Sequence, residues 1–171
     1  MIPDSERYDR QIRVFGLNTQ QKLSQCNLLI IGTNLLTQEI LKNLVLTGVR
    51  SISILPTDQT SPILGILGNE SNREEIITRC NQINSNVSVD FITDPSIDNL
   101  HFDQFDAIFV TDLSYSTFNF PCSNVFFVFS NGPIGIFIHL PSTKTVSLQE
   151  FLLSIDPIFT DHQESKKRSN K

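Results

Sequence analysis

The sequence has little of what several classes of protein require. It contains no tryptophan and three cysteines (Cys26, Cys80 and Cys122), an odd number with no CxxC pair. A disulfide framework and a zinc site are therefore not expected, and a reducing intracellular compartment is the default. No window reaches the ~18 uninterrupted apolar residues of a membrane span, and the first ten residues, MIPDSERYDR, lack the apolar centre of a signal peptide. We expect a soluble intracellular protein with no membrane partner.

The chain also lacks an excess of positive charge. Its 13 basic and 18 acidic residues give a net charge of −5, which argues against a whole-surface nucleic-acid binder. A length of 171 residues with a 39% hydrophobic fraction suits one domain, which we predict over 1–160. Residues 161–171 are predicted to be a disordered polar tail. Their basic run at 166–168 is weak support for nuclear import, and the predicted location is nucleus and cytoplasm.

What the chain does contain is an alternation of apolar strands and amphipathic helices. This order predicts an α/β fold, a Rossmann-like parallel sheet flanked by helices. Gly16 interrupts the first predicted helix, Gly48 ends the second, and a capping box of Ser71 and Glu74 starts the third. The predicted helices are 8–24, 37–47, 71–83, a short turn at 118–120, and a last one at 147–155; the predicted strands are 27–31, 51–55, 87–91, 107–111, 125–130 and 134–140.

The turn after the first strand lies where a nucleotide-binding loop belongs. A strand, a turn at Gly32 and a helix N-terminus form the usual cradle for a pyrophosphate. That cradle needs glycine at its second and third positions, for close backbone approach and for contact between helix and strand. Segment 32–37 reads GTNLLT and carries Leu35 and Thr37 at those positions. The sequence therefore predicts the strand–turn–helix arrangement of a nucleotide site without the close backbone contacts that bind the phosphates.

Residues 7–50 resemble the opening of the ThiF-type activating enzymes for ubiquitin-like modifiers, and most closely the smaller, non-adenylating subunit of the SUMO-activating enzymes. The resemblance rests on RYDRQIR-x-x-G-x-x-x-Q-x-x-L, on the apolar strand with its glycine turn, and on E-I-x-K-N-L-x-L-x-G-V. It continues more loosely through 71–84, 105–111 and 126–137. The sequence stops before the last part of that family's adenylation domain, so either the protein is a reduced family member or the sequence is incomplete; the expected fold is a C-terminally shortened ThiF-type fold.

The departures from this family are as informative as the matches. Besides Leu35 and Thr37, the position of the acidic residue that binds the ribose in catalytic members holds Pro56, and Asp58 comes two residues late. Asp112 is nearest to the family's magnesium-binding aspartate but lacks the surrounding motif. The zinc CxxC pairs and the nucleophilic cysteine have no counterpart. The resemblance therefore implies no cofactor or metal bound by this chain, with ATP and Mg on a partner subunit.

Arg10 is the one candidate catalytic residue. As the first arginine of D-R-Q-I-R, it resembles the family's arginine finger, which one subunit passes into the ATP site of the other. The alternative is that Arg10 pairs with Asp9 or Glu6 on a solvated helix face. For Arg7 and Arg13 we predict structural ion pairs. Tyr8, Ile12 and Phe15 are predicted to anchor this helix to the core or to a partner helix, of which the core is the commoner outcome.

The predicted function is that of a non-catalytic subunit of a heterodimeric modifier-activating enzyme, with SUMO as the predicted modifier. Its partners would be a larger catalytic subunit and, through the complex, the modifier; the chain alone would be a pseudoenzyme without activity. One alternative keeps the fold as a degenerate scaffold or binding module with no activating role. A nucleotide- or NAD-dependent Rossmann enzyme is a third reading, against which Leu35, Thr37 and Pro56 all argue.

Overall fold

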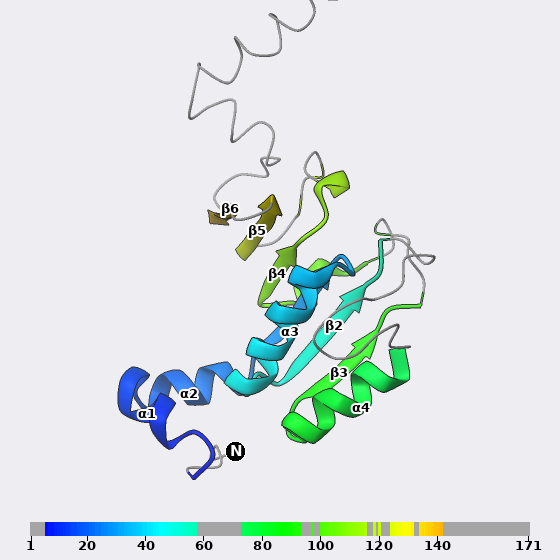
Figure 1. Cartoon of the computed structure of the whole chain (residues 1–171). Helices are drawn as coiled ribbons and strands as arrows, with labels where there is room; N and C mark the ends of the chain where they lie inside the picture. Colours follow the sequence, from blue (N-terminus) through cyan, green and yellow to red (C-terminus); the bar gives the residue numbers. More distant parts are fainter. Residues whose placement is uncertain are drawn as a thin grey trace, which may run out of the picture.

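The computed structural model describes residues 6–57, 73–93, 97, 100–115, 118, 120, 124–131 and 134–141. Helices and strands alternate along this part of the chain, as the sequence predicts (Figure 1). Their order is α1 (Asp9–Phe15), α2 (Leu17–Leu23), β1 (Asn27–Ile31), α3 (Leu35–Thr47), β2 (Ser51–Leu55), α4 (Arg73–Ile83), β3 (Ser88–Phe91), η2 (Phe102–Gln104), β4 (Ala107–Val110), η3 (Leu113–Tyr115), β5 (Asn124–Asn131) and β6 (Ile134–Pro141).

The strands form one sheet in the order β3-β2-β1-β4-β5-β6. Strands β1 to β5 run parallel to their neighbours, whereas β6 pairs with β5 in the antiparallel direction. The predicted α/β fold is confirmed, with a mostly parallel sheet. The antiparallel edge follows from the short connection between β5 and β6, since parallel strands need a crossover of a dozen or more residues.

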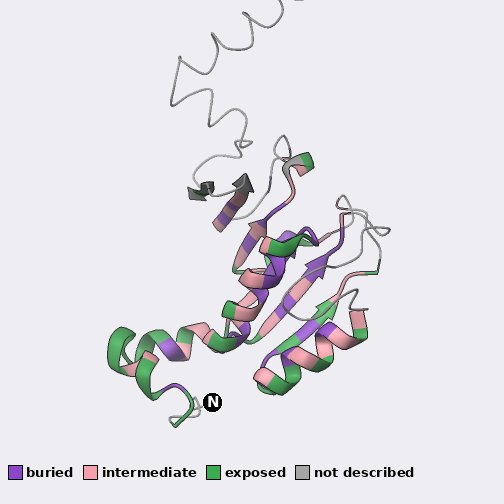
Figure 2. Ribbon diagram, in the orientation of Figure 1, coloured by how far each residue is buried: buried purple, intermediate pink, exposed green. Residues whose placement is uncertain are grey.

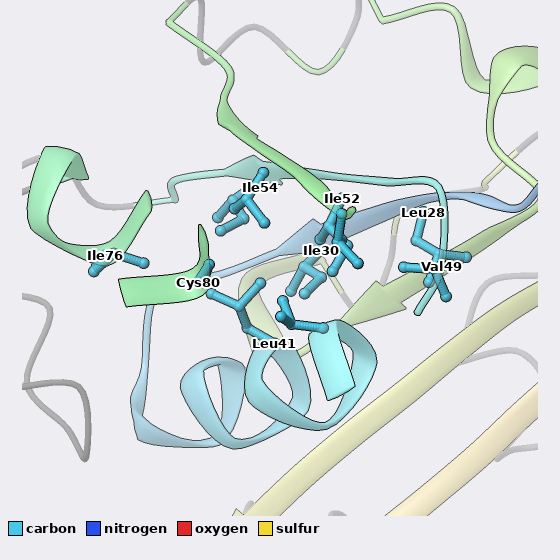
Figure 3. Close-up of a cluster of buried hydrophobic side chains, with 11 residues drawn as sticks. Leu28, Ile30, Leu41, Val49, Ile52, Ile54, Ile76 and Cys80 are labelled. Carbon is cyan, nitrogen blue, oxygen red and sulfur yellow. The ribbon is translucent and has the colours of Figure 1, made fainter. Parts of the chain in front are cut away.

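Apolar side chains fill both faces of the sheet. Alternate residues of one strand point to opposite faces, so β1 contributes Leu28 and Ile30 to one cluster and Leu29 and Ile31 to another. Burial on both faces explains why β1 is a continuous apolar run (Figure 2). Helices α3 and α4 cover the first face, where the cluster comprises Leu28, Ile30, Leu41, Val45, Val49, Ile52, Ile54, Ile76, Cys80, Val87 and Val89 (Figure 3).

The strand ends match the predictions to within one residue, and two helical segments differ by more. Helix α3 begins at Leu35 instead of residue 37, and the short helical turn after β4 lies at Leu113–Tyr115, not at 118–120. The predicted 8–24 helix is two helices broken at Gly16, as expected from that glycine. The capping residue Ser71, the predicted helix at 147–155 and the tail at 161–171 lie outside the described residues. No helix within the described ranges is long and apolar enough to cross a membrane.

Candidate functional site

The loop after β1 lies where the strand order changes direction. Strand β1 is paired with β2 on one side and with β4 on the other, which makes it the switch point where ligands bind in α/β sheets. Gly32 begins this loop with φ of 125°, and its N–H donates to the Leu55 carbonyl at 3.0 Å. A Cβ at this position would collide with the Thr111 hydroxyl. The loop therefore requires glycine at 32, as its sequence position suggests.

Asn34 starts α3. Its Oδ1 accepts from the Thr37 N–H at 3.0 Å, and its Nδ2 donates to the Thr111 carbonyl at 2.9 Å. Asparagine is a preferred N-cap because its side chain satisfies a backbone donor that the helix leaves unpaired. This explains why α3 begins at Leu35, two residues before the predicted start. The signal was present in the sequence, in the asparagine itself.

Thr37 is buried and bridges α3 to the end of β4. Its hydroxyl lies 2.7 Å from the Thr111 hydroxyl, which donates to the Ile31 carbonyl at 3.1 Å. We call Asn34, Thr37 and Thr111 the loop network. In a nucleotide-binding loop, position 37 is a glycine without a side chain, which lets the helix and the strand touch. Here the hydroxyls of Thr37 and Thr111 join the helix to the strand instead. The side chains of Asn34, Thr37 and Thr111 are thus hydrogen-bonded to one another and to the backbone around them.

Leu35 behaves differently from Thr37. It occupies the first turn of α3, and its side chain is 60% exposed. It therefore fills no interior space, and places an apolar side chain at the helix N-terminus where backbone N–H groups would otherwise meet a phosphate. Of the two substitutions for glycine, one turns inward to hydrogen-bond and one turns outward into solvent.

The other nucleotide-site positions also lack the expected chemistry. Pro56 is buried directly after β2, and Asp58 lies outside the described residues. Asp112 follows β4, and its Oδ1 accepts from the N–H and the hydroxyl of Ser114 at 2.9 and 2.8 Å. It therefore closes a turn. Within the described ranges, no group of three or more His, Cys, Asp or Glu residues is placed to hold a metal ion.

The opposite end of α3 is held by side chains from distant parts of the chain. The last carbonyls of a helix have no partner within it. Here Asn84 Nδ2 donates to the Val45 carbonyl at 2.8 Å, Gln11 Nε2 to that of Leu46 at 3.1 Å, and Gln20 Nε2 to that of Thr47 at 2.9 Å. We call Gln11, Gln20 and Asn84 the amide clamp. Sequence reasoning missed it, because the partners of these amides depend on the tertiary fold.

Tyr8 joins the N-terminal helices to the same place. Its ring is 3% exposed, and its hydroxyl accepts from Asn84 Nδ2 at 2.7 Å. Gly48, with φ of 79°, ends α3 and leaves room for the ring, since a Cβ there would collide with it. The predicted anchoring is confirmed for Tyr8. Ile12 is half-buried, and Phe15 does not anchor the helix to the core, since its side chain is 60% exposed; its contact with a partner helix stays a prediction.

Arg10 lies in α1 and is exposed. The alternative that it pairs with Asp9 is contradicted, because Arg13 Nε contacts Asp9 Oδ2 at 2.9 Å, the ion pair predicted for Arg13. Arg7 donates from Nη1 to the Ile83 carbonyl at 2.9 Å. No described residue forms a hydrogen bond or ion pair with the Arg10 side chain. Its guanidinium is available to a ligand or a partner.

The two ends of α3 are far apart. Helix α3 runs from its cap at Asn34 past Leu46. At a rise of 1.5 Å per residue, the twelve steps from Asn34 to Leu46 span about 18 Å. The amide clamp on Leu46 therefore places α1 at the end of α3 remote from the loop network, as Figure 1 shows. Arg10 does not serve the loop of its own chain.

The described cysteines are not poised for nucleophilic chemistry. Burial raises the pKa of Cys80 to about 11. Burial and the nearby Asp106 carboxylate also raise the pKa of Cys26. Because the thiolate is the nucleophile, both thiols are held in their unreactive form near neutral pH. Cys122 lies outside the described residues.

Comparisons by sequence point to one group of proteins. The chain is 32% identical over 123 residues to "SUMO-activating enzyme subunit 1" of Xenopus tropicalis, covering 65% of this chain and 35% of that protein. It is 44% identical over 59 residues to the Rattus norvegicus protein of the same name, covering 34% of this chain and 17% of that protein. The chain thus spans about a third or less of these relatives' length. No family model matches it.

Comparisons by structure agree on the fold. E. coli MccB in complex with succinimide superposes with a TM-score of 0.65 at 17% identity, over 96% of this chain and 56% of that one. E. coli tRNA N6-threonylcarbamoyladenosine dehydratase TcdA, in complex with ATP, gives 0.51 at 16% identity, over 66% of this chain and 52% of that one. At such identities the similarity concerns the fold alone.

Proposed function

The chain is related to the ThiF-type activating enzymes, and from that premise we propose that it is a non-catalytic subunit of a heterodimeric enzyme that activates a ubiquitin-like modifier. The relatives by sequence indicate SUMO as that modifier. The partner would be a larger catalytic subunit that binds ATP and Mg and adenylates the modifier's C-terminus. The complex would act in nucleus and cytoplasm, and the chain alone would have no activity.

The observation that carries this proposal is the placement of Arg10. The side chain is exposed and has no partner among the described residues, and its helix is bonded to Leu46, about 18 Å along α3 from the Asn34 cap of the loop network. Adenylation of a carboxylate builds negative charge on the phosphates as pyrophosphate leaves. A planar, permanently charged guanidinium binds those oxygens with little reorganisation. Arg10 is therefore suited to an active site on another polypeptide.

The loop network supports the second half of the proposal, that this chain holds no ATP. A phosphate site at this turn needs free backbone N–H groups and a close approach of the backbone. The Thr37 N–H is already paired with Asn34, and the exposed Leu35 stands at the helix N-terminus. Pro56 offers no carboxylate for a ribose. Each of three contacts that a nucleotide requires is thus missing or occupied.

The test is ATP–pyrophosphate exchange by the complex with the larger SUMO-activating subunit of the same species. We expect Arg10→Ala to lower the exchange rate by about 10²–10³-fold, the usual effect of removing one donor from developing negative charge. Arg13→Ala is the matched control, since it removes the same charge from the same helix but from a residue already paired with Asp9. The proposal fails if the two variants behave alike, or if the chain exchanges pyrophosphate without a partner.

A scaffold or binding module of the same fold is the second candidate. Three exposed apolar residues surround the corner between α1 and α2: Val14 (74% exposed), Phe15 (60%) and Leu17 (45%). Such a corner suits a protein contact of either kind. Co-purification from native cells separates the candidates, because only the first requires a larger ThiF-type subunit among the proteins recovered.

A further inference from the structure

Helix α1 is attached to the domain in an unusual way. None of its seven residues is fully buried, and Ile12 is the one apolar side chain of the helix that is not exposed, so apolar burial sets the rotation of the helix about its axis only weakly. Figure 2 shows α1 as largely exposed. The side chain of Gln11 ties α1 to the body of the domain, since its Nε2 donates to the Leu46 carbonyl at 3.1 Å. Tyr8 and Arg7 hold the chain before the helix, and Gln20 holds α2 after it.

Gln11 directly follows Arg10. Successive residues of an α-helix point about 100° apart around its axis. Because the Gln11 side chain points toward the C-terminal end of α3, the Arg10 side chain points in another direction. The Arg10 side chain is exposed. Loss of the Gln11 contact would free α1 to rotate. The contact between Gln11 and Leu46 thus sets the direction in which Arg10 projects.

Gln11 is also a poor choice for stability alone. Its Oε1 is buried and has no hydrogen-bond partner among the described residues. A buried acceptor left unpaired offsets much of what the donated bond contributes. A side chain with a donor and no buried acceptor would cap the Leu46 carbonyl at lower cost. Orientation of α1 is therefore a better account of Gln11 than its contribution to folding.

We propose that Gln11 is the positioning residue for Arg10: by capping the Leu46 carbonyl it fixes α1 so that the guanidinium projects toward the partner's ATP site. This inference rests on the proposed function. It assigns Gln11 no contact with substrate. Its effect on the reaction passes entirely through Arg10.

The test measures ATP–pyrophosphate exchange by the complex with the larger subunit, for Gln11→Ala, Gln11→Lys, Arg10→Ala and the double variant Arg10→Ala with Gln11→Ala. We expect Gln11→Ala to lower the rate by about 10-fold, because small misplacements of a charged group near reacting atoms are costly. Gln11→Lys should retain most of the rate, since an ammonium also donates to the last carbonyls of a helix. In the Arg10→Ala background, Gln11→Ala should change nothing further.

Each other outcome counts against one specific claim. Full activity of Gln11→Ala, beside a large loss in Arg10→Ala, overturns the positioning role and leaves the proposed function standing. An equal fold-loss from Gln11→Ala in both backgrounds shows general damage to the domain and overturns it as well. Failure of Gln11→Lys to recover the rate excludes donation to Leu46 as the cause. If Arg10→Ala itself is fully active, the proposed function fails.

Discussion

The two ends of helix α3 satisfy their unpaired backbone groups in opposite ways. At the N-terminal end, Asn34 caps the helix and Thr37 reaches Thr111 on the adjoining strand. At the C-terminal end, the donors come from three separate elements or connections, through Gln11, Gln20 and Asn84. The first end is closed upon itself at the place where a nucleotide would bind. The second end binds the N-terminal helices and leaves α1, with Arg10, exposed.

The two ends of α3 depend on different parts of the chain. The loop network is local to the carboxyl ends of the central strands β1 and β4 and involves no residue of the N-terminal helices. The amide clamp exists only while α1 and α2 lie against α3, so damage there should affect Arg10 before it affects the sheet. Substitutions at the two ends ought therefore to have separable consequences for stability and for the activity of the complex.

The largest loss of stability is expected at the C-terminal end, from Gly48→Ala. A φ of 79° disfavours alanine by about 1–3 kcal/mol, and the new Cβ must displace the Tyr8 ring, which costs about 1–3 kcal/mol more. Gly16→Ala is the control, because φ there is 86° but nothing lies within 4 Å of the new Cβ. Urea unfolding of the purified chain measures both. Equal losses would mean that Tyr8 is not held against Gly48.

An intermediate loss is expected at the N-terminal end, from Thr111→Val. The change keeps the shape but removes the hydroxyl between Ile31 and Thr37, at a cost of about 1–2 kcal/mol. Thr37→Val should then cost less in the Thr111→Val background than alone, by about 0.5 kcal/mol or more. Additive effects in the unfolding experiment would show that these two hydroxyls are not bonded to each other.

The smallest effect is expected from the ion pair on α1. Arg13 and Asp9 are 76% and 52% exposed, so their attraction is screened by water. Breaking the pair with Arg13→Ala should change the free energy of unfolding by about 0.3 kcal/mol. A loss above about 1 kcal/mol would contradict its role as a control for Arg10, because it would make Arg13 an anchor of the helix.

The spacing of apolar residues predicted most of the helices and strands of this fold. Strand β1 matches the predicted 27–31 because burial on both faces leaves a plain apolar run, and β2 matches 51–55 because its apolar and polar residues alternate. Gly16 and Gly48 end helices where expected, since their positive φ angles disfavour other residues. Residues 58–72 and those after 141, including the predicted tail, lie outside the described residues and remain predictions.

The candidate site was only partly visible in the sequence. The lost glycines of segment 32–37 were evident, but the inward turn of Thr37 and the outward turn of Leu35 depend on where Thr111 lies in the sheet. The clamp residue Gln11 gave no signal at all, because its partner is a carbonyl far along the chain. The pair of Asp9 with Arg13 could have been preferred from i, i+4 spacing, which would have left Arg10 unpaired at once.

Titration of the isolated chain with Mg–ATP tests the central claim, that this polypeptide holds no nucleotide and lends an arginine to one that does. Calorimetry should show no saturable heat for the chain alone, and one ATP per heterodimer once the larger subunit is added. Binding of one ATP to the isolated chain would contradict the account, and a loop variant such as Thr37→Arg that abolished it would place that nucleotide at the turn after β1.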